Sequence, residues 1–293
     1  MLKEIFAFSE QSLNHLENEL LDKRQGMLLE RDYQKYRIMV ISMNLVHPGL
    51  KCAYFAGRWV DDIADGDENL PPGFNSVDEW IDQMKNHVLT YGTENQTILL
   101  GQNAAFLFQR AIQHVQPYEK KAQGDNVQTE FAEFLEAMRS EYHRRITPVP
   151  LAEDEIVKRY WDCFSHAQNI TLIALKAKER IPPTFPPVKE MLVMSPDELP
   201  LILPIILGKA YAVYDLKEEL VKGICNIPDT VLAESGIDIL ALINNPSITD
   251  TNEIIQSWIK EELQVSSLLV KKLRRKKMDF RSKLLVRFLT TGI

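Results

Sequence analysis

Two short acidic segments carry the residues best able to do chemistry in this 293-residue chain. In the first segment, Asp61 and Asp65 are four residues apart and share one helix face, with Asp62 beside them. Arg58 and Tyr54 precede Asp61 by three and seven residues, on the same stripe. Two carboxylates on a largely buried helix repel each other and require a cation. Oxygen ligands suit a hard ion such as Mg²⁺, with Mn²⁺ as the alternative.

The second segment follows a strongly apolar stretch, residues 201–213. Asp215 and Glu219 share a helix face at i,i+4, and Glu218 lies beside them at i,i+3. We expect the two segments to face each other across a cavity, where Mg²⁺ ions would bridge them to a diphosphate. Each segment also has an ordinary interpretation: the first as an exposed acidic helix end, the second as a surface run of mixed charge.

Apolar residues recur at helical spacing along almost the whole chain, and no stretch alternates as a strand would. Proline-rich loops separate the helical stretches, but no linker divides two classes of composition. We therefore expect one all-α domain over residues 1–293. The predicted helices cover residues 5–22, 49–65, 78–91, 97–115, 127–146, 152–179, 196–222 (broken at Lys222-Gly223) and 251–288.

Composition narrows the classes of function. Apolar residues make up 45% of the chain, enough for a sizeable core, and the net charge of −7 argues against nucleic acid as a partner. No glycine-rich phosphate loop is present, and three widely spaced cysteines favour a reducing compartment. The longest apolar stretch, residues 199–214, is interrupted by prolines and a lysine and is shorter than the ~20 residues of a membrane span. We expect a cytoplasmic protein.

Both acidic segments resemble motifs of the squalene/phytoene synthase family. The stretch from Tyr54 to Asp65 resembles the helix Y-x-F-C-R-x-x-D-D-x-x-D of that family. The stretch from Asp215 to Pro228 resembles its second motif, R-D-x-x-E-D-x-x-x-G-R-x-x-x-P, with Glu219 where an Asp is usual. The resemblance covers roughly residues 35–285. It implies a helical isoprenoid-synthase bundle with a central apolar cavity, and Mg²⁺-dependent ionisation of prenyl diphosphates.

The resemblance also suggests roles for individual residues. Arg58 and Lys222 would contact the diphosphate, because a guanidinium fork and an ammonium both suit phosphate oxygens. Aromatic faces would stabilise a carbocation in a dry cavity. The expected metal ligands are Asp61, Asp62, Asp65, Asp215, Glu218 and Glu219; the expected catalytic aromatics are Tyr54, Tyr160 and Tyr211; further substrate contacts are expected at His166, Asn169 and Tyr214.

This chain departs from the family around the expected cavity. Gly208, Tyr211 and Tyr214 stand where the family usually has Gln, Asn and Arg, and residues 165–169 replace its glycine-rich stretch. Three functions stay open. The first is head-to-head condensation of two farnesyl or geranylgeranyl diphosphates; the second is cyclisation of one prenyl diphosphate by a terpene cyclase; the third is a non-catalytic lipid-binding or assembly factor. A need for NADPH and the oligomeric state also stay open.

A basic run near the end of the chain, residues 271–277, has two interpretations. Basic helices beside apolar residues are typical of contacts with anionic membrane surfaces, so a peripheral membrane contact is one expectation. A solvated basic face on the last helix is the other.

Overall fold

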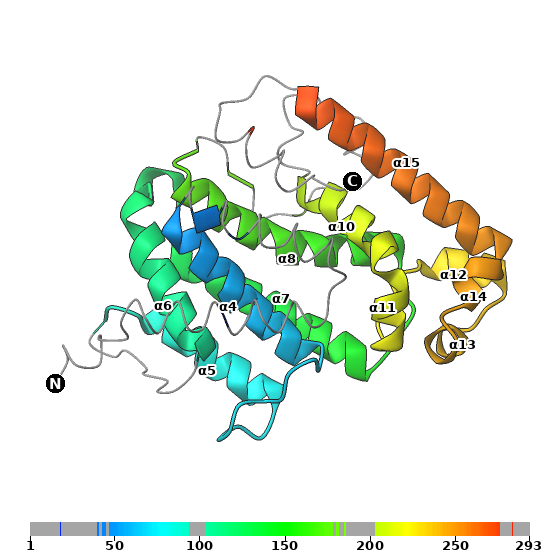
Figure 1. The fold of residues 1–293 in the computed structure, drawn as a ribbon, viewed down its shortest axis with the longest axis horizontal. Coiled ribbons are helices and arrows are strands. Elements are labelled where there is room, and N and C mark those ends of the chain that lie inside the picture. Colours follow the sequence, from blue (N-terminus) through cyan, green and yellow to red (C-terminus); the bar gives the residue numbers. More distant parts are fainter. Residues whose placement is uncertain are drawn as a thin grey trace.

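The computed structural model describes residues 47–93, 103–177 and 203–275, together with a few single residues outside these ranges. Within the described residues every regular element is a helix, which agrees with the all-α prediction (Figure 1). The α-helices are α4 (Pro48–Ala64), α5 (Val77–Thr90), α6 (Asn103–Val115), α7 (Val127–Ile146), α8 (Glu153–Ala174), α10 (Leu203–Tyr214), α11 (Leu216–Val221), α12 (Asp229–Ser235), α13 (Ile239–Asn244), α14 (Ile248–Thr251) and α15 (Glu253–Arg275), and two 3₁₀ turns are Gln116–Tyr118 and Lys121–Gln123.

Polar side chains cap the starts of several of these helices, three of which carry or support the larger core. His47 accepts a hydrogen bond from the backbone N–H of Gly49 at the start of α4. Ser76 accepts one from Glu79 at the start of α5, and Asn126 plays the same part for α7. The first N–H groups of a helix have no partner inside the helix, so these caps fix where each helix begins.

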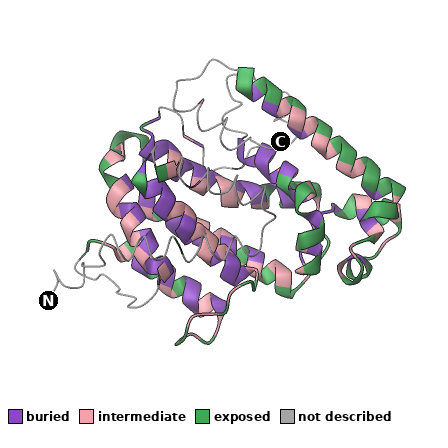
Figure 2. Ribbon diagram, viewed as in Figure 1, coloured by how far each residue is buried: buried purple, intermediate pink, exposed green. Residues whose placement is uncertain are grey.

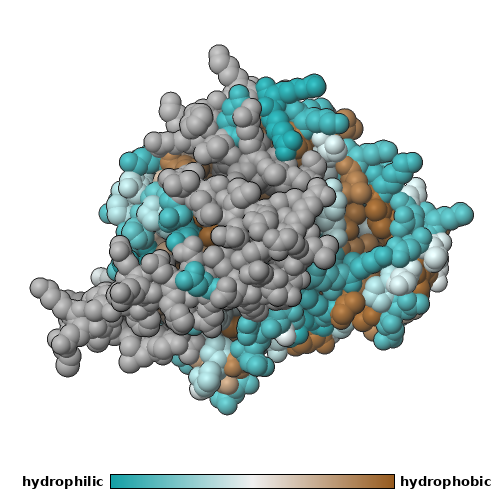
Figure 3. Space-filling view, in the orientation of Figure 1, coloured by the Kyte–Doolittle hydropathy of each residue, from teal (hydrophilic) through white to brown (hydrophobic). Residues whose placement is uncertain are grey.

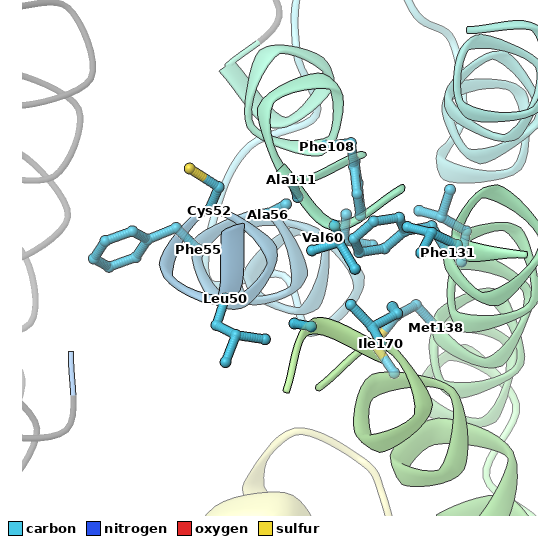
Figure 4. Close-up of a cluster of buried hydrophobic side chains, with 14 of the residues drawn as sticks. Leu50, Cys52, Phe55, Ala56, Val60, Phe108, Ala111, Phe131, Met138 and Ile170 are labelled. Atoms are coloured by element: carbon cyan, nitrogen blue, oxygen red, sulfur yellow. The ribbon is translucent and has the colours of Figure 1, made fainter. Parts of the chain in front are cut away.

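The larger hydrophobic core joins α4, α6, α7 and α8. α4 packs along α6, α7 lies between α5 and α8, and α10 lies between α8 and α15 (Figure 1). The rings of Phe108 and Phe131 meet edge to face at 5.0 Å. Buried residues line the inward faces of these helices (Figure 2). Figure 4 labels side chains from this core: Leu50, Cys52, Phe55, Ala56, Val60, Phe108, Ala111, Phe131, Met138 and Ile170.

A second, smaller core lies among α11 to α15. It holds α11, which carries part of the second acidic segment, against the short helices α12 to α14. These short helices were not predicted, because each is too brief to show a helical period. The buried members of this core are Leu216, Leu220, Cys225, Ile227, Leu232, Ile239, Leu242 and Ile255.

Several predicted boundaries differ from the structure. The helix expected over residues 196–222 is interrupted at Asp215, whose backbone (φ −98°, ψ 5°) leaves the helical region between α10 and α11. The helix expected over residues 152–179 ends at Ala174, shortly before Lys176 with its φ of 55°. The predicted helix 5–22 lies outside the described residues apart from one position. Among the described helices, none combines the length and the apolar character needed to cross a membrane.

Gly208 allows α10 to approach α8 closely. A Cβ atom at this position would overlap the Cβ atom and ring of Tyr160. Gly57, on α4, is a second helical glycine, but a Cβ there would only touch the ring tip of the half-buried Phe134, at 3.3 Å. Comparing an alanine substitution at Gly208 with one at Gly57 therefore separates the effect of a steric clash from the effect of helix propensity.

We predict that Gly208→Ala lowers the free energy of unfolding by about 1–3 kcal/mol, because overpacking against Tyr160 outweighs the ~1 kcal/mol helix preference of alanine. Gly57→Ala is the control and should be neutral or slightly stabilising. Urea unfolding followed by circular dichroism measures both changes. Equal stabilisation by the two substitutions would contradict the close packing of α10 on α8.

Candidate functional site

The first acidic segment lies at the C-terminal end of α4. Tyr54, Arg58 and Asp61 are half-buried along one stripe of the helix, as their spacing predicts. Asp62, the next residue, is buried, with only 2% of its side chain exposed. The guanidinium of Arg58 donates to the carboxylates of both Asp61 and Asp62, at 2.7 Å to Asp62 Oδ1. One arginine therefore serves two adjacent carboxylates, one half-buried and one buried.

Lys222 joins the second acidic segment to the first. It caps the C-terminal end of α11, and its Nζ donates to Asp65 Oδ2 at 3.0 Å and to Asp67 Oδ2 at 2.9 Å. It also lies 3.6 Å from Glu218 Oε1. The charges of Arg58 and Lys222 both act on the carboxyl of Asp215. The two segments, far apart in sequence, therefore lie within electrostatic reach of each other.

The C-terminal end of α7 supports both segments. Arg145 Nη1 donates to the backbone carbonyl of Asp65 at 2.9 Å, where α4 ends. Beside it, Gly66 has a φ of 78°, and a Cβ there would overlap the Arg145 guanidinium. After α11, Gly223 has a φ of 89° and lies so near the Arg145 carbonyl that a Cβ would come within 2.9 Å of it. Only glycine fits both turns without strain.

A buried charged layer lies behind the second segment. Arg159, on α8, forms an ion pair with Glu141 of α7 and donates to the side-chain oxygen of Asn226. Its Nη2 also lies 3.7 Å from Glu219 Oε1, and its guanidinium stacks over the ring of Tyr160 at 4.3 Å. Asn226 is fully buried and donates to the Tyr160 hydroxyl at 3.1 Å. Arg159 therefore ties α11 to α7 and α8.

Arg144 adds a second cation to this buried layer. Its Nη2 donates to the Cys225 carbonyl at 2.9 Å and to Asn226 Oδ1 at 3.2 Å, and its Nη1 lies 3.5 Å from Glu141 Oε2. Glu219 Oε2, in contrast, is buried and has no hydrogen-bond partner among the residues that the structure describes. A buried carboxylate oxygen without a donor is costly, so Glu219 is an incompletely neutralised group at the edge of the layer.

Four carboxyl groups at this junction have raised pKa values. Burial is the largest cause for Asp61, Asp65, Asp215 and Glu219, and neighbouring carboxylates add to it. For Glu219, the pKa rises to about 8. Arg58 and other nearby cations oppose the rise but do not cancel it. Desolvation therefore disfavours the charged forms of these carboxyl groups, and a further cation or a proton would stabilise them.

The donor chemistry suits a divalent ion, whereas the present positions do not assemble one complete site. The available oxygens are carboxylates, which Mg²⁺ and Mn²⁺ prefer. Within the described part of the chain, however, no three His, Cys, Asp or Glu side chains converge on one point. Asp61 and Asp65 are held by Arg58 and Lys222, respectively. Metal ligation would need these ion pairs to open.

An aromatic stack lies beside the acidic residues. The rings of Tyr160 and Phe164 stack at 6.2 Å, and those of Phe164 and Tyr211 stack at 6.0 Å, which links α8 to α10. Partial desolvation, followed by the charge of Asp215, raises the pKa of Tyr211, although the residue is 39% exposed. Tyr214 is more than half exposed and lies outside the stack. Of the expected aromatics, Tyr160 and Tyr211 therefore belong to one surface, and Tyr54 lies on the α4 stripe.

His166 and Asn169 have partners on α7 instead of among the acidic residues. His166 Nδ1 lies 2.7 Å from Glu130 Oε2. The side-chain amide of Asn169 donates to Glu130 Oε1 at 3.2 Å and to the carbonyl of Ile181, whose N–H it accepts at 2.8 Å. These bonds join α8 to α7 and to the chain after α8. They give both residues a role in packing, and a substrate contact by either stays a prediction.

We predict that Arg159→Met lowers the free energy of unfolding by about 3–5 kcal/mol, because Glu141 would keep a buried charge beside one fewer cation. The adjacent Lys158 is the matched control: it is exposed and pairs with the exposed Asp162, so Lys158→Met should cost less than ~1 kcal/mol. Denaturant unfolding compares them. Similar losses for both variants would contradict the buried layer.

The raised pKa of Glu219 predicts a fall in stability with rising pH. Between its ordinary value of 4.5 and about 8, the folded state keeps a proton that the unfolded state has lost. The free energy of unfolding should therefore decrease as pH rises through this window, by on the order of a few kcal/mol. Glu219→Gln should flatten the decrease, whereas Glu234→Gln, on the exposed surface of α12, should not. Urea unfolding from pH 4 to pH 9 measures the slopes, and an unaltered slope in Glu219→Gln contradicts the prediction.

No family model, curated protein or solved structure matches this chain in the three comparisons made. The resemblance to squalene and phytoene synthases therefore depends on the two acidic motifs, and a function has to be inferred from the geometry of the junction between α4 and α11.

Proposed function

We propose that this chain is a Mg²⁺-dependent prenyltransferase, which condenses two farnesyl- or geranylgeranyl-type diphosphates head to head and releases diphosphate. The observation that carries the proposal is the contact of Lys222 with Asp65, which brings the two acidic segments together. An enzyme of this kind must hold a diphosphate and ionise it beside an apolar surface, and the junction between α4 and α11 offers groups for both tasks.

Charge favours a diphosphate held together with metal ions. The carboxylates alone would repel a diphosphate, and Arg58 and Lys222 are engaged with them. Mg²⁺ would neutralise carboxylates and diphosphate together and stabilise the charge of the leaving group. The residues that would hold it are Asp61, Asp65, Asp215 and Glu219. Arg58 and Lys222, released from their ion pairs, could then donate to phosphate oxygens.

The aromatic stack suits the other product of ionisation, an allylic carbocation. The faces of Tyr160, Phe164 and Tyr211 lie one after another beside the acidic residues, and aromatic faces attract cations. Tyr54 and Phe134 are half-buried apolar side chains nearby on α4 and α7. We propose that these side chains form the wall of an apolar cavity for the prenyl chain, as expected for an isoprenoid-synthase bundle.

A terpene cyclase is a second candidate with the same initial ionisation. It is favoured by Gly208, Tyr211 and Tyr214 at the places where condensing enzymes usually have Gln, Asn and Arg. Incubation with farnesyl and geranylgeranyl diphosphates, with and without NADPH, followed by mass analysis of hydrocarbons, separates the two. A product with the carbon count of two substrates supports condensation, whereas the carbon count of one supports cyclisation.

A non-catalytic lipid-binding or assembly role is the third candidate. The ion pairs of Arg58 with Asp61 and of Lys222 with Asp65 favour it, because they satisfy these acids without a metal ion. Calorimetry with Mg²⁺ and a non-hydrolysable prenyl diphosphate analogue distinguishes the roles. Analogue binding that requires Mg²⁺ supports the enzyme, and Mg²⁺-independent binding of the lipid supports the non-catalytic role.

We predict that Asp61→Asn and Asp215→Asn each reduce diphosphate release from farnesyl or geranylgeranyl diphosphate by at least ~100-fold, because each removes a charge that would bind the metal ion. Asp82→Asn is the control, since Asp82 is exposed on α5 and pairs with Arg139. A coupled diphosphate assay measures the rate, and circular dichroism verifies folding. Wild-type release by both site variants would exclude the proposed function.

A further inference from the structure

Charge is strongly segregated along the chain. Residues 271–293 contain nine Lys or Arg and one acid, a net charge of +8, which leaves residues 1–270 with a net charge of −15. The described part of this basic region is the C-terminal turn of α15, at the upper edge of Figure 1. Figure 3 shows hydrophilic side chains on this part of the surface. A cationic end on an otherwise acidic protein would orient the whole molecule toward an anionic surface.

Three basic side chains follow an exposed leucine on one face of α15. Leu268 is 59% exposed, and Lys271, Lys272 and Arg275 follow it at i+3, i+4 and i+7, so the four residues share one helix face. All three cations are exposed, and none forms an ion pair with another described residue. We call these four residues the basic face.

The opposite side of α15 is fixed to the core. Val270 and Leu273 are buried in the larger core. Further toward the N-terminus of α15, Glu262 pairs with Lys209 of α10 at 3.0 Å, and Lys209 also contacts Glu153 of α8 at 2.8 Å. The basic face is therefore presented by a helix that is anchored along its inner side, and it points away from the protein.

We propose that the basic face binds an anionic lipid membrane, with Leu268 entering the headgroup region and the three cations contacting lipid phosphates or carboxylates. Charge complementarity gives the attraction, and the exposed apolar side chain at the N-terminal edge of the cations distinguishes a bilayer from a purely polyanionic partner. Along a nucleic acid backbone, Leu268 would contribute nothing. This inference does not depend on the proposed enzymatic function.

Vesicle co-sedimentation of the full chain tests the proposal. We expect binding to phosphatidylcholine vesicles that contain phosphatidylserine, little binding to pure phosphatidylcholine, and release at 1 M salt, where the screening length falls to ~3 Å. Each lysine near an anionic surface contributes about fivefold to the partition, so Lys271→Gln with Lys272→Gln should weaken binding by about 25-fold.

Matched variants separate a specific face from net charge. Lys121→Gln with Lys158→Gln removes the same charge at two exposed positions outside α15 and should weaken binding by less than about threefold. Leu268→Ser should weaken binding, whereas Leu240→Ser, at a similarly exposed leucine on α13, should not. All six substitutions are on the surface, so the four variants should fold, and circular dichroism verifies this.

Three results would overturn the proposal. One is the absence of binding to phosphatidylserine vesicles at low salt. Another is an equal loss of binding in the control and test lysine pairs. The third is displacement of the protein from vesicles by double-stranded DNA, together with a loss of DNA binding in the Lys271 and Lys272 variant, which would indicate a nucleic acid partner. Because none of these results involves diphosphate release, they leave the proposed function untouched.

Discussion

The ion pair between Lys222 and Asp65 is the interaction on which the acidic junction depends. It joins the end of α11 to the end of α4, and the second bond of Lys222, to Asp67, extends the link into the following turn. Desolvation and mutual repulsion still raise the pKa values of Asp61 and Asp215, although Asp61 is half-buried and Asp215 exposed. Neighbouring groups with perturbed pKa values are typical of functional sites, which is why we propose a function for the junction.

A buried charged layer next to the junction helps to hold the acidic residues in place. Arg159 and Arg144 both contact Glu141 and the amide oxygen of Asn226, so each buried cation has several acceptors. Glu219 lies at the border of this layer and the junction, and its second carboxylate oxygen has no donor in the described part of the chain. The position of Glu219 couples the packing of α7 and α8 to the charge of the acidic junction. A change in this packing would therefore alter the electrostatics of the junction, and a change of charge at the junction would alter the packing.

Local pattern was enough to predict the longer helices and the acidic stripes, because both depend on spacings of three or four residues. The helix break at Asp215 was not predicted, because the helical pattern of apolar residues continues through it. The contacts of Arg159 were not predicted either, because its partner Asn226 lies 67 residues away in the sequence. Nothing in the sequence marks Arg159 as buried, because charged neighbours precede it on α8. Contacts of this kind depend on tertiary packing, which spacing along one helix does not encode.

One helix links the acidic junction to the basic face of α15. α10 contributes Tyr211 to the aromatic stack and Lys209 to the ion pair with Glu262 of α15, and it is followed directly by Asp215 and α11. Gly208 brings the same helix against Tyr160. A molecule held on a lipid surface by α15 would therefore have its acidic junction fixed in orientation through packed helices, and a lipid-like substrate would meet the junction from a constant direction.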